Sequence, residues 1–187
     1  MELNNIFEKY FNPCSYEPLK EDKEMCKECG GCCCKSMGCH ISPFDLKEVS
    51  VESIISLITE SNCVSIDWWE GNPNTGNHDD TRTYFLRIKN NNSKVIDPSF
   101  GGVCSILTDK GCPLPFEYRP KGARDLVPAY IDCEAYYSKQ CCAIDWYNYQ
   151  NVMKAVYSYF EAQKDMSEFC LLTSIFNDLL NTVSEKE

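Results

Sequence analysis

Six cysteines lie within fourteen residues of this sequence, between Cys26 and Cys39. They are Cys26, Cys29, Cys32, Cys33, Cys34 and Cys39. Two Cys-x2-Cys steps share Cys29, and thiolates at this spacing are the usual ligands of zinc ions and iron–sulfur clusters. Gly30 and Gly31 allow the tight backbone turn that brings successive sulfurs together. The segment therefore predicts a thiolate-bound metal site, in preference to a set of inert buried thiols or a disulfide knot.

The consecutive cysteines Cys32 and Cys33 bear on the number of metals in such a site. Side chains of neighbouring residues point apart in most backbone conformations, so adjacent cysteines serve two metals better than one. This favours a polynuclear centre or a pair of sites over one mononuclear zinc. The run begins like a bacterial ferredoxin motif, but Ser36 stands where that motif has its fourth cysteine. The spacing alone suits iron–sulfur and zinc about equally.

The other cysteines divide into two sets. One set falls in the second half of the chain and comprises Cys104, Cys112, Cys133, Cys141 and Cys142. The isolated cysteines are Cys14, Cys63 and Cys170. Cys63 begins a predicted strand and Cys170 lies on an apolar helix face, so we expect both to pack as small hydrophobic side chains. The histidines are weaker candidates: His40, beside Cys39, as a metal ligand, and His78 as part of a solvated loop.

The composition limits the class of partner. The chain has 187 residues and is 43% hydrophobic, which is enough for a single domain with a buried core. Its net charge of −10 disfavours nucleic acid and anionic membranes, which attract basic surfaces. No run approaches the roughly 20 apolar residues of a membrane span, and Met1 to Ile6 lack the start of a secretory signal. We therefore expect a cytoplasmic protein with reduced thiols, whose partner is a metal ion or cluster, with a protein as a second possible partner.

Local patterns predict short elements around the cysteines. Capping serines mark two helix starts, Ser42 before Pro43 and Ser50 before a helix at 51–60. The inner face of the helix at 51–60 is expected to carry Ile54, Ile55 and Ile58. The further expected elements are a helix at 3–11, strands at 63–69, 81–88 and 103–107, a polar loop at 71–80 and a turn at 109–111.

The C-terminal quarter, 141–187, is predicted to be an antiparallel helical hairpin. Apolar residues recur at three- and four-residue steps from Trp146 to Phe160 and again from Phe169 to Val183, with a break near Asp165. Together these elements predict one α+β domain over 1–187. It would combine a small irregular cysteine-rich metal-binding core at 26–133 with a short antiparallel sheet and the hairpin.

The run Cys26-x2-Cys29-x2-Cys32-Cys33 resembles that of the YkgJ-type cysteine-cluster family, described as CxxCxxCC zinc- or iron-chelating or iron–sulfur-cluster-containing proteins. Later segments match in the same order. These are Pro43 to Leu46, Tyr84 to Leu86, Cys104 to Leu107, Gly111 to Leu114, and Arg119-Pro120 with Arg124. The resemblance covers roughly residues 26–133 and leaves the N-terminal helix and the C-terminal hairpin outside it.

The resemblance implies a ligand set that joins the two halves of the motif. It comprises Cys26, Cys29, Cys32, Cys33, Cys104 and Cys112. The family commonly has Arg-Pro-x2-Cys-Arg, whereas this chain has Ala123 at the position of that cysteine. Either one coordination position is open, or Cys133, Cys39 or Cys34 takes its place. Catalytic metal sites keep an open position, so the first case would suit an enzyme.

The two arginines of this half-motif, Arg119 and Arg124, are candidate cofactor-binding residues. Guanidinium groups beside a thiolate-rich centre offset its charge and tune its potential through hydrogen bonds to sulfur. The alternative is an ordinary salt bridge with Glu117 or Asp125.

The leading functional hypothesis is a metal-binding protein with an iron–sulfur cluster, or with zinc or another polynuclear thiolate site, for redox, metal handling or sensing. One alternative is a metal-dependent protein-modifying enzyme such as a methyl- or other group-transferase, because some members of the family are labelled flagellin lysine N-methylases. Another is a structural zinc module that presents the helical hairpin to a protein.

Overall fold

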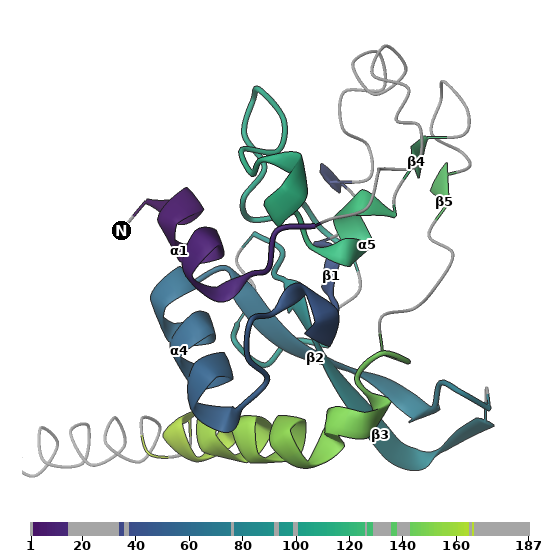
Figure 1. Ribbon diagram of the computed structural model, residues 1–187. Helices are drawn as coiled ribbons and strands as arrows, with labels where there is room; N and C mark the ends of the chain where they lie inside the picture. Colours follow the sequence, from purple (N-terminus) through teal and green to yellow (C-terminus); the bar gives the residue numbers. More distant parts are fainter. Residues whose placement is uncertain are drawn as a thin grey trace, which may run out of the picture.

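The computed structural model describes residues 2–14, 34–35, 38–75, 77–91, 94–98, 101–125, 127–128, 136–137, 143–164 and 166. Among these residues, short helices surround a small antiparallel sheet, so the α+β class predicted from the sequence is confirmed (Figure 1). The predicted cysteine segment 26–33 and the predicted second helix of the hairpin lie outside the described residues, apart from Met166, which is helical.

A three-stranded antiparallel sheet forms the centre of the described fold. Its order is β1 (His40–Ile41), β3 (Asn77–Ile88) and β2 (Val64–Asn72). His40 lies opposite Arg87 on β3. Strand β2 and strand β3 pair over most of their length, and the inner residues of all three strands are buried. The sheet therefore holds the short strand that directly follows Cys39 against the longest strand of the molecule.

The hairpin of β2 and β3 is longer than the sequence predicts, and the prediction of a polar loop at 71–80 is wrong. Strand β2 continues to Asn72 and β3 begins at Asn77, so both strands extend into the predicted loop, and residues 73–75 are the described part of the turn. Glu70 lies opposite Arg82, and their side chains form an exposed ion pair of 3.7 Å. Gly71 adopts a φ of 86°, which accommodates the bulge between Glu70 and Asn72. Cross-strand pairing thus continues through residues whose polarity predicts a loop.

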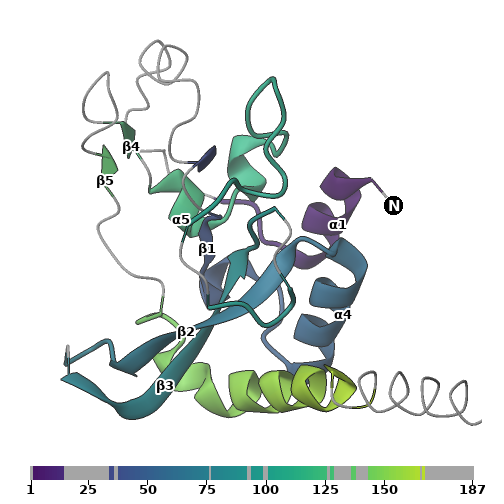
Figure 2. The same ribbon diagram turned by 180° about the vertical axis from the view of Figure 1, so that it is seen from behind.

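Two helices pack on each other beside the sheet, as Figure 2 shows from behind. They are α1 (Leu3–Tyr10) and α4 (Val51–Ser61), and both match predicted helices. Ser50 caps α4 as expected, since its hydroxyl accepts a hydrogen bond of 3.2 Å from the Ser53 amide. The buried face of α4 consists of Ile54, Leu57 and Ile58, whereas Ile55, expected inside, is half-buried.

The segment around Ser42 forms one turn of 3-10 helix, η1 (Pro43–Asp45), and not a longer helix. The predicted cap is present: the Phe44 amide donates to the Ser42 hydroxyl, and the Ser42 amide donates to the Asp45 carboxylate at 2.8 Å. The strand predicted at 103–107 is wrong. Cys104 forms only an isolated antiparallel bridge with Asn90, after which the chain turns.

A helix over 150–164 follows the 3-10 turn η3 (Tyr147–Tyr149) and runs along the lower side of the fold in Figure 1. Its first part is attached to the sheet by Gln150, whose side-chain amide pairs with both backbone groups of Tyr84 at 2.9 Å. The ring of Tyr157 then packs on Tyr84 with a centroid distance of 4.7 Å. The first helix of the predicted C-terminal hairpin is therefore confirmed.

Candidate metal centre

Four described segments that carry cysteines, those of Cys34, Cys39, Cys63 and Cys104, meet near the C-terminal end of β3, where the Lys89 amide donates to the carbonyl of Cys63 at 2.8 Å. The Ile88 amide donates to the carbonyl of Cys39 at 2.8 Å, and the Cys104 amide donates to the carbonyl of Cys34 at 2.7 Å. The end of the consecutive cysteine run is thereby joined to a residue seventy positions later in the chain. The sequence predicts that the two halves of the motif come together, and these backbone bonds join the described parts of those halves.

Four thiols lie close enough to interact electrostatically: those of Cys34, Cys39, Cys104 and Cys112. They are called the thiol cluster below. Burial raises the pKa of the Cys39 thiol well above its ordinary value, and negative charge on Cys104, Cys112 and Cys34 raises it further. Burial likewise raises the pKa of Cys104, with Cys112 adding to the effect. A buried thiol of this kind loses its proton when a metal cation supplies the compensating charge.

The described thiols supply part of the predicted ligand set. Cys39, Cys104 and Cys112 belong to it, whereas Cys26, Cys29, Cys32, Cys33 and Cys133 lie outside the described residues. Within the described part of the chain, no group of three or more His, Cys, Asp or Glu side chains is arranged to hold a metal ion. The chemistry of the cluster nevertheless fits a soft metal, since its donors include thiols free of disulfides at Cys39, Cys104 and Cys112, of which Cys104 is buried and the other two are partly buried.

Cys63 and Cys14 are not among the predicted ligands, although negative charge on Cys63 adds to the rise in the pKa of Cys104. Cys63 is buried at the start of β2 and packs in the hydrophobic core, as predicted. Cys14 lines a surface pocket described below. Cys141, Cys142 and Cys170 are outside the described residues.

The helix α5 (Lys121–Arg124) lies against β1, directly beside the thiol cluster. A Cβ atom on Gly122 would come within 2.6 Å of the backbone N and O of His40, so only glycine permits this approach. Ala123 and Cys39 are each one residue away from this contact. Gly122 therefore brings α5 into contact with the residue that follows Cys39.

Arg124 forms a buried ion pair with Asp45. The Nη2 atom of Arg124 lies 2.8 Å from Oδ1 of Asp45, and the two side chains are 7% and 1% exposed. The Asp45 carboxylate also accepts from the amides of Ser42 and Lys121, each at 2.8 Å. The salt-bridge alternative predicted from the sequence pairs the two arginines with Glu117 or Asp125, so it misses Asp45 as the partner of Arg124. The capping box identifies Asp45 as a capping acid but gives no signal that points to Arg124.

Arg119 donates from Nε to the carbonyl of Leu114 at 3.1 Å, and its guanidinium lies 5.7 Å from the centre of the Phe116 ring. Arg124 also donates to the carbonyl of Arg119. These contacts link the 3-10 turn η2 (Phe116–Tyr118) to α5. The role of both arginines toward a cofactor stays a prediction.

Residues before the C-terminal helix anchor to β1 and η1. The Asp145 carboxylate accepts from the Ser42 hydroxyl at 2.7 Å and from the Lys121 ammonium at 2.8 Å. The indole of Trp146, which is fully buried, donates to the carbonyl of Ile41 at 2.7 Å. The thiol-bearing segment is therefore braced from two sides, by α5 and by residues 145–146.

A pocket of about 500 Å³ lies beside the Asp45–Arg124 pair, and both residues line it. Its lining residues are Asn12, Pro13, Cys14, Phe44, Asp45, Lys121, Arg124 and Asp125. Phe44 is 70% exposed at this site. Burial raises the pKa of the Asp125 carboxyl, and the charges of Lys121 and Arg124 partly offset that rise. The pocket is thus bordered by residues on both sides of Ala123.

His40 is half-buried and directly follows Cys39. Its ring packs on Phe85 with a centroid distance of 4.7 Å. Burial, and to a lesser extent the charge of Arg87, lowers the pKa of His40 to about 4. The imidazole is therefore neutral at neutral pH, which is the form that binds metals. The side chain of His78 is outside the described residues.

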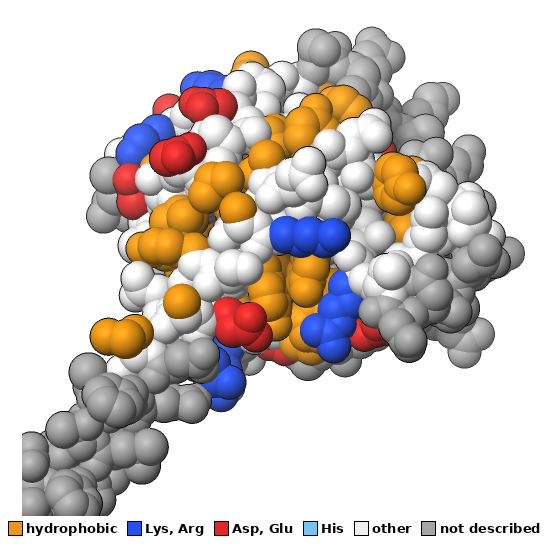
Figure 3. All heavy atoms as spheres, turned by 90° about the horizontal axis from the view of Figure 1, so that it is seen from below, with side chains coloured by type: hydrophobic (Ala, Val, Ile, Leu, Met, Phe, Trp, Pro, Cys, Tyr) orange, Lys and Arg blue, Asp and Glu red, His pale blue; other side chains and the backbone are white. Residues whose placement is uncertain are grey.

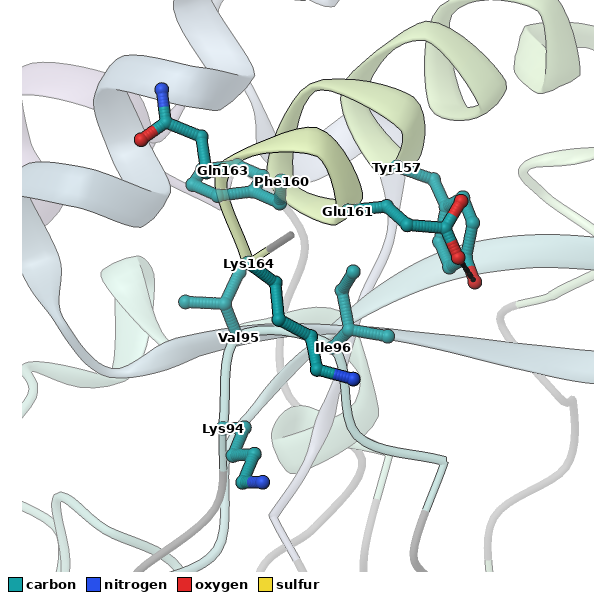
Figure 4. A pocket seen from close by; sticks show the side chains of 8 residues that line it. All are labelled: Lys94, Val95, Ile96, Tyr157, Phe160, Glu161, Gln163 and Lys164. Atoms are coloured by element: carbon teal, nitrogen blue, oxygen red, sulfur yellow. Dashed lines mark hydrogen bonds between the residues drawn. The ribbon is translucent and has the colours of Figure 1, made fainter. Parts of the chain in front are cut away.

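A second pocket, of about 380 Å³, lies on the C-terminal helix, and Figure 4 shows it from close by. Val95, Ile96 and Phe160 give it apolar walls, and the hydroxyl of Tyr157 donates to Glu161 at 2.8 Å across one end. Seen from below in Figure 3, hydrophobic side chains on this face alternate with basic and acidic ones. None of the thiols of the cluster lines this pocket.

None of the helices in the described part of the chain is long and apolar enough to cross a membrane. In comparisons with known proteins, no family model, no curated protein and no solved structure matches this chain.

Proposed function

We propose that this protein binds an iron–sulfur cluster, or another polynuclear metal site held by thiolates, and uses it for redox chemistry, metal handling or sensing. The supporting observation is the bond from the Cys104 amide to the Cys34 carbonyl. It brings the end of the run Cys26 to Cys34 to the second half of the motif. Cys29, Cys32 and Cys33 would then reach the same centre as Cys104 and Cys112.

The surroundings of the thiol cluster support this proposal chemically. Burial makes the neutral thiol the stable form of Cys39 and Cys104, so a bound cation is needed to hold both as thiolates. A cluster would supply the redox chemistry when bound. The protein groups provide burial, a fixed backbone and the ring of His40 nearby. Consecutive Cys32 and Cys33 favour more than one metal position, which is why we place iron–sulfur before zinc.

Metal analysis of protein purified without oxygen tests the proposal. We expect a brown protein with iron and acid-labile sulfide, and loss of both in Cys104→Ser. The control is Cys170→Ser, since Cys170 is expected to pack on an apolar helix face, and it should keep its metal. Stoichiometric zinc without iron would favour a structural zinc module. Folded protein that binds neither metal would contradict the proposal.

A metal-dependent modifying enzyme, such as a methyl- or other group-transferase, is the second candidate. The observation that favours it is the pocket bordered by Lys121, Arg124 and Asp125, which flank Ala123. For this function, a substrate would have to reach the coordination position left open at Ala123 from this pocket. In that case Ala123→Cys should close the position and lower turnover by the metal-loaded protein. Unchanged turnover in Ala123→Cys would rule out the open position.

We also propose a cytoplasmic location. Cys39, Cys63, Cys104 and Cys112 are free of disulfides, which suits a reducing compartment.

A further inference from the structure

We infer that Asn90 is a positioning residue of the thiol cluster, which sets the distance between the segment that carries Cys39 and the loop that carries Cys104. The inference rests on the proposed function, since it concerns how the same centre is held. Asn90 follows the end of β3, is only 3% exposed and carries no charge.

Both ends of the Asn90 side-chain amide are used. Its Oδ1 accepts a buried hydrogen bond of 2.7 Å from the amide of Gly38, next to Cys39. Its Nδ2 donates to the carbonyl of Gly101, three residues before Cys104. One side chain therefore connects the two cysteine-bearing segments. The two partners are an N–H group and a carbonyl, so the bridging side chain needs one acceptor and one donor, as an amide has.

The backbone beside Asn90 continues this connection. Asn90 and Cys104 form an antiparallel bridge. The Asn91 amide donates to the carbonyl of Val103 at 2.8 Å, and the Ser105 amide donates to the carbonyl of Lys89 at 2.9 Å. On the other side, the Ile88 amide holds the Cys39 carbonyl. Residues 88–91 thus lie between the segment of Cys39 and the loop of Cys104. The side chain of Asn90 forms hydrogen bonds with both of these segments.

Glycines allow the two segments to come this close. A Cβ atom on Gly38 would lie 1.8 Å from the carbonyl oxygen of Ile88, which no side chain can tolerate. Gly102 has a φ of 112°, and a Cβ there would meet the Cβ of Asn90 at 3.1 Å. The space around Asn90 is therefore matched to its size, and a shorter side chain would leave both loops without their shared partner.

Titration of the metal-free protein with Co²⁺ alone, without oxygen, tests the inference through the thiolate-to-cobalt charge-transfer absorption. For Asn90→Ala we expect about 10- to 100-fold weaker Co²⁺ binding, the range seen when groups that orient metal ligands are removed. We also expect weaker charge-transfer absorption at saturation, because fewer thiolates reach the metal. A purely structural role would not change that spectrum in protein that remains folded.

Gln150→Ala is the matched control. The Gln150 amide makes the same pair of bonds to the backbone of Tyr84, and a third bond to the carbonyl of Trp146. Tyr84 lies on β3, six residues before Asn90, which is about 20 Å away at the usual rise per residue of extended chain. Gln150→Ala should lower the stability at least as much and leave the cobalt spectrum and affinity unchanged.

Asn90→Asp keeps the side-chain volume and the bond from Gly38 but cannot donate to Gly101. It provides a test if Asn90→Ala does not fold, and it should weaken Co²⁺ binding in the same direction. Equal affinities and spectra for the wild type, the Asn90 variants and Gln150→Ala would overturn the inference while leaving the proposed function intact. A wild type that binds neither Co²⁺ nor iron would overturn both.

Discussion

At the scale of single residues, the most connected polar group near the candidate centre is the carboxylate of Asp45. It is 1% exposed and accepts bonds from two backbone amides and from Arg124. These bonds join η1 to α5 next to Cys39. A buried carboxylate is tolerated only when it is paired in this way, so Asp45 and Arg124 depend on each other.

Replacing Arg124 should therefore destabilise the protein strongly. Arg124→Ala leaves Asp45 buried without its cation, and we expect a loss of about 3–5 kcal/mol in the free energy of unfolding. Urea denaturation measures it. Arg82→Ala, which removes an exposed pair with Glu70, should cost less than about 1 kcal/mol. Equal losses in the two variants would contradict this account of the pair.

Asp125 predicts a pH effect of a definite sign. Burial holds the pKa of its carboxyl above the ordinary value of 3.8, so the folded state binds this proton more tightly than the unfolded state. Protonated Asp125 therefore stabilises the folded state at low pH, and this stabilisation is lost as the pH rises through the raised pKa. Asp125→Asn should therefore raise the stability at pH 7, and the gain should shrink toward pH 3.8. A gain independent of pH in urea denaturation would contradict this.

At the scale of elements, the short strand β1 is held mainly by its neighbours. It has two residues, and it pairs with β3 and packs against α5, and its Ile41 carbonyl accepts a hydrogen bond from the indole of Trp146. Because Cys39 directly precedes β1, these contacts also position a candidate ligand. The order of the thiol cluster thus depends on elements that contain no cysteine.

Removing Trp146 should show this dependence. Trp146→Ala deletes a fully buried ring and the bond to Ile41, and we expect a loss of about 3–5 kcal/mol. Trp69→Ala is the control, since Trp69 is 36% exposed, and its cost should be clearly smaller. Thermal unfolding compares the two. A small loss in Trp146→Ala would mean that β1 is held without the C-terminal segment.

At the scale of the whole molecule, charge links metal binding to stability. The chain carries a net charge of −10, and thiolates in a metal-free site would add to it. Under the proposed function, a bound cation relieves this repulsion and joins segments far apart in sequence.

Removing the metal with a chelator should therefore lower the Tm. Each kcal/mol of stabilisation that is lost corresponds to about 2–4 °C for a chain of this size. Salt should recover part of the loss, because it screens the remaining negative charges. Calorimetry before and after chelation measures both effects. An unchanged Tm after complete metal loss would show that folding and metal binding are independent.

The sequence by itself determined the elements whose signals are local. The caps at Ser42 and Ser50 and the periodicity of α1, α4 and the C-terminal helix are read over a few residues, and these elements form where expected. Local polarity failed at 71–80, where cross-strand pairing extends the hairpin. The thiol spacing indicated metal chemistry but could not show which segments meet.

Which distant segments contact one another was decided only by the tertiary structure. The residues around Asp45 do not indicate Arg124 as its partner, and those around Gly38 do not indicate Asn90. Each pair forms only when distant segments bury their polar groups together. The juxtaposition of Cys34 and Cys104 arises in the same way, from a backbone bond that the folded chain alone can make. Sequence patterns report what a residue prefers locally, whereas burial and long-range hydrogen bonds select its partners.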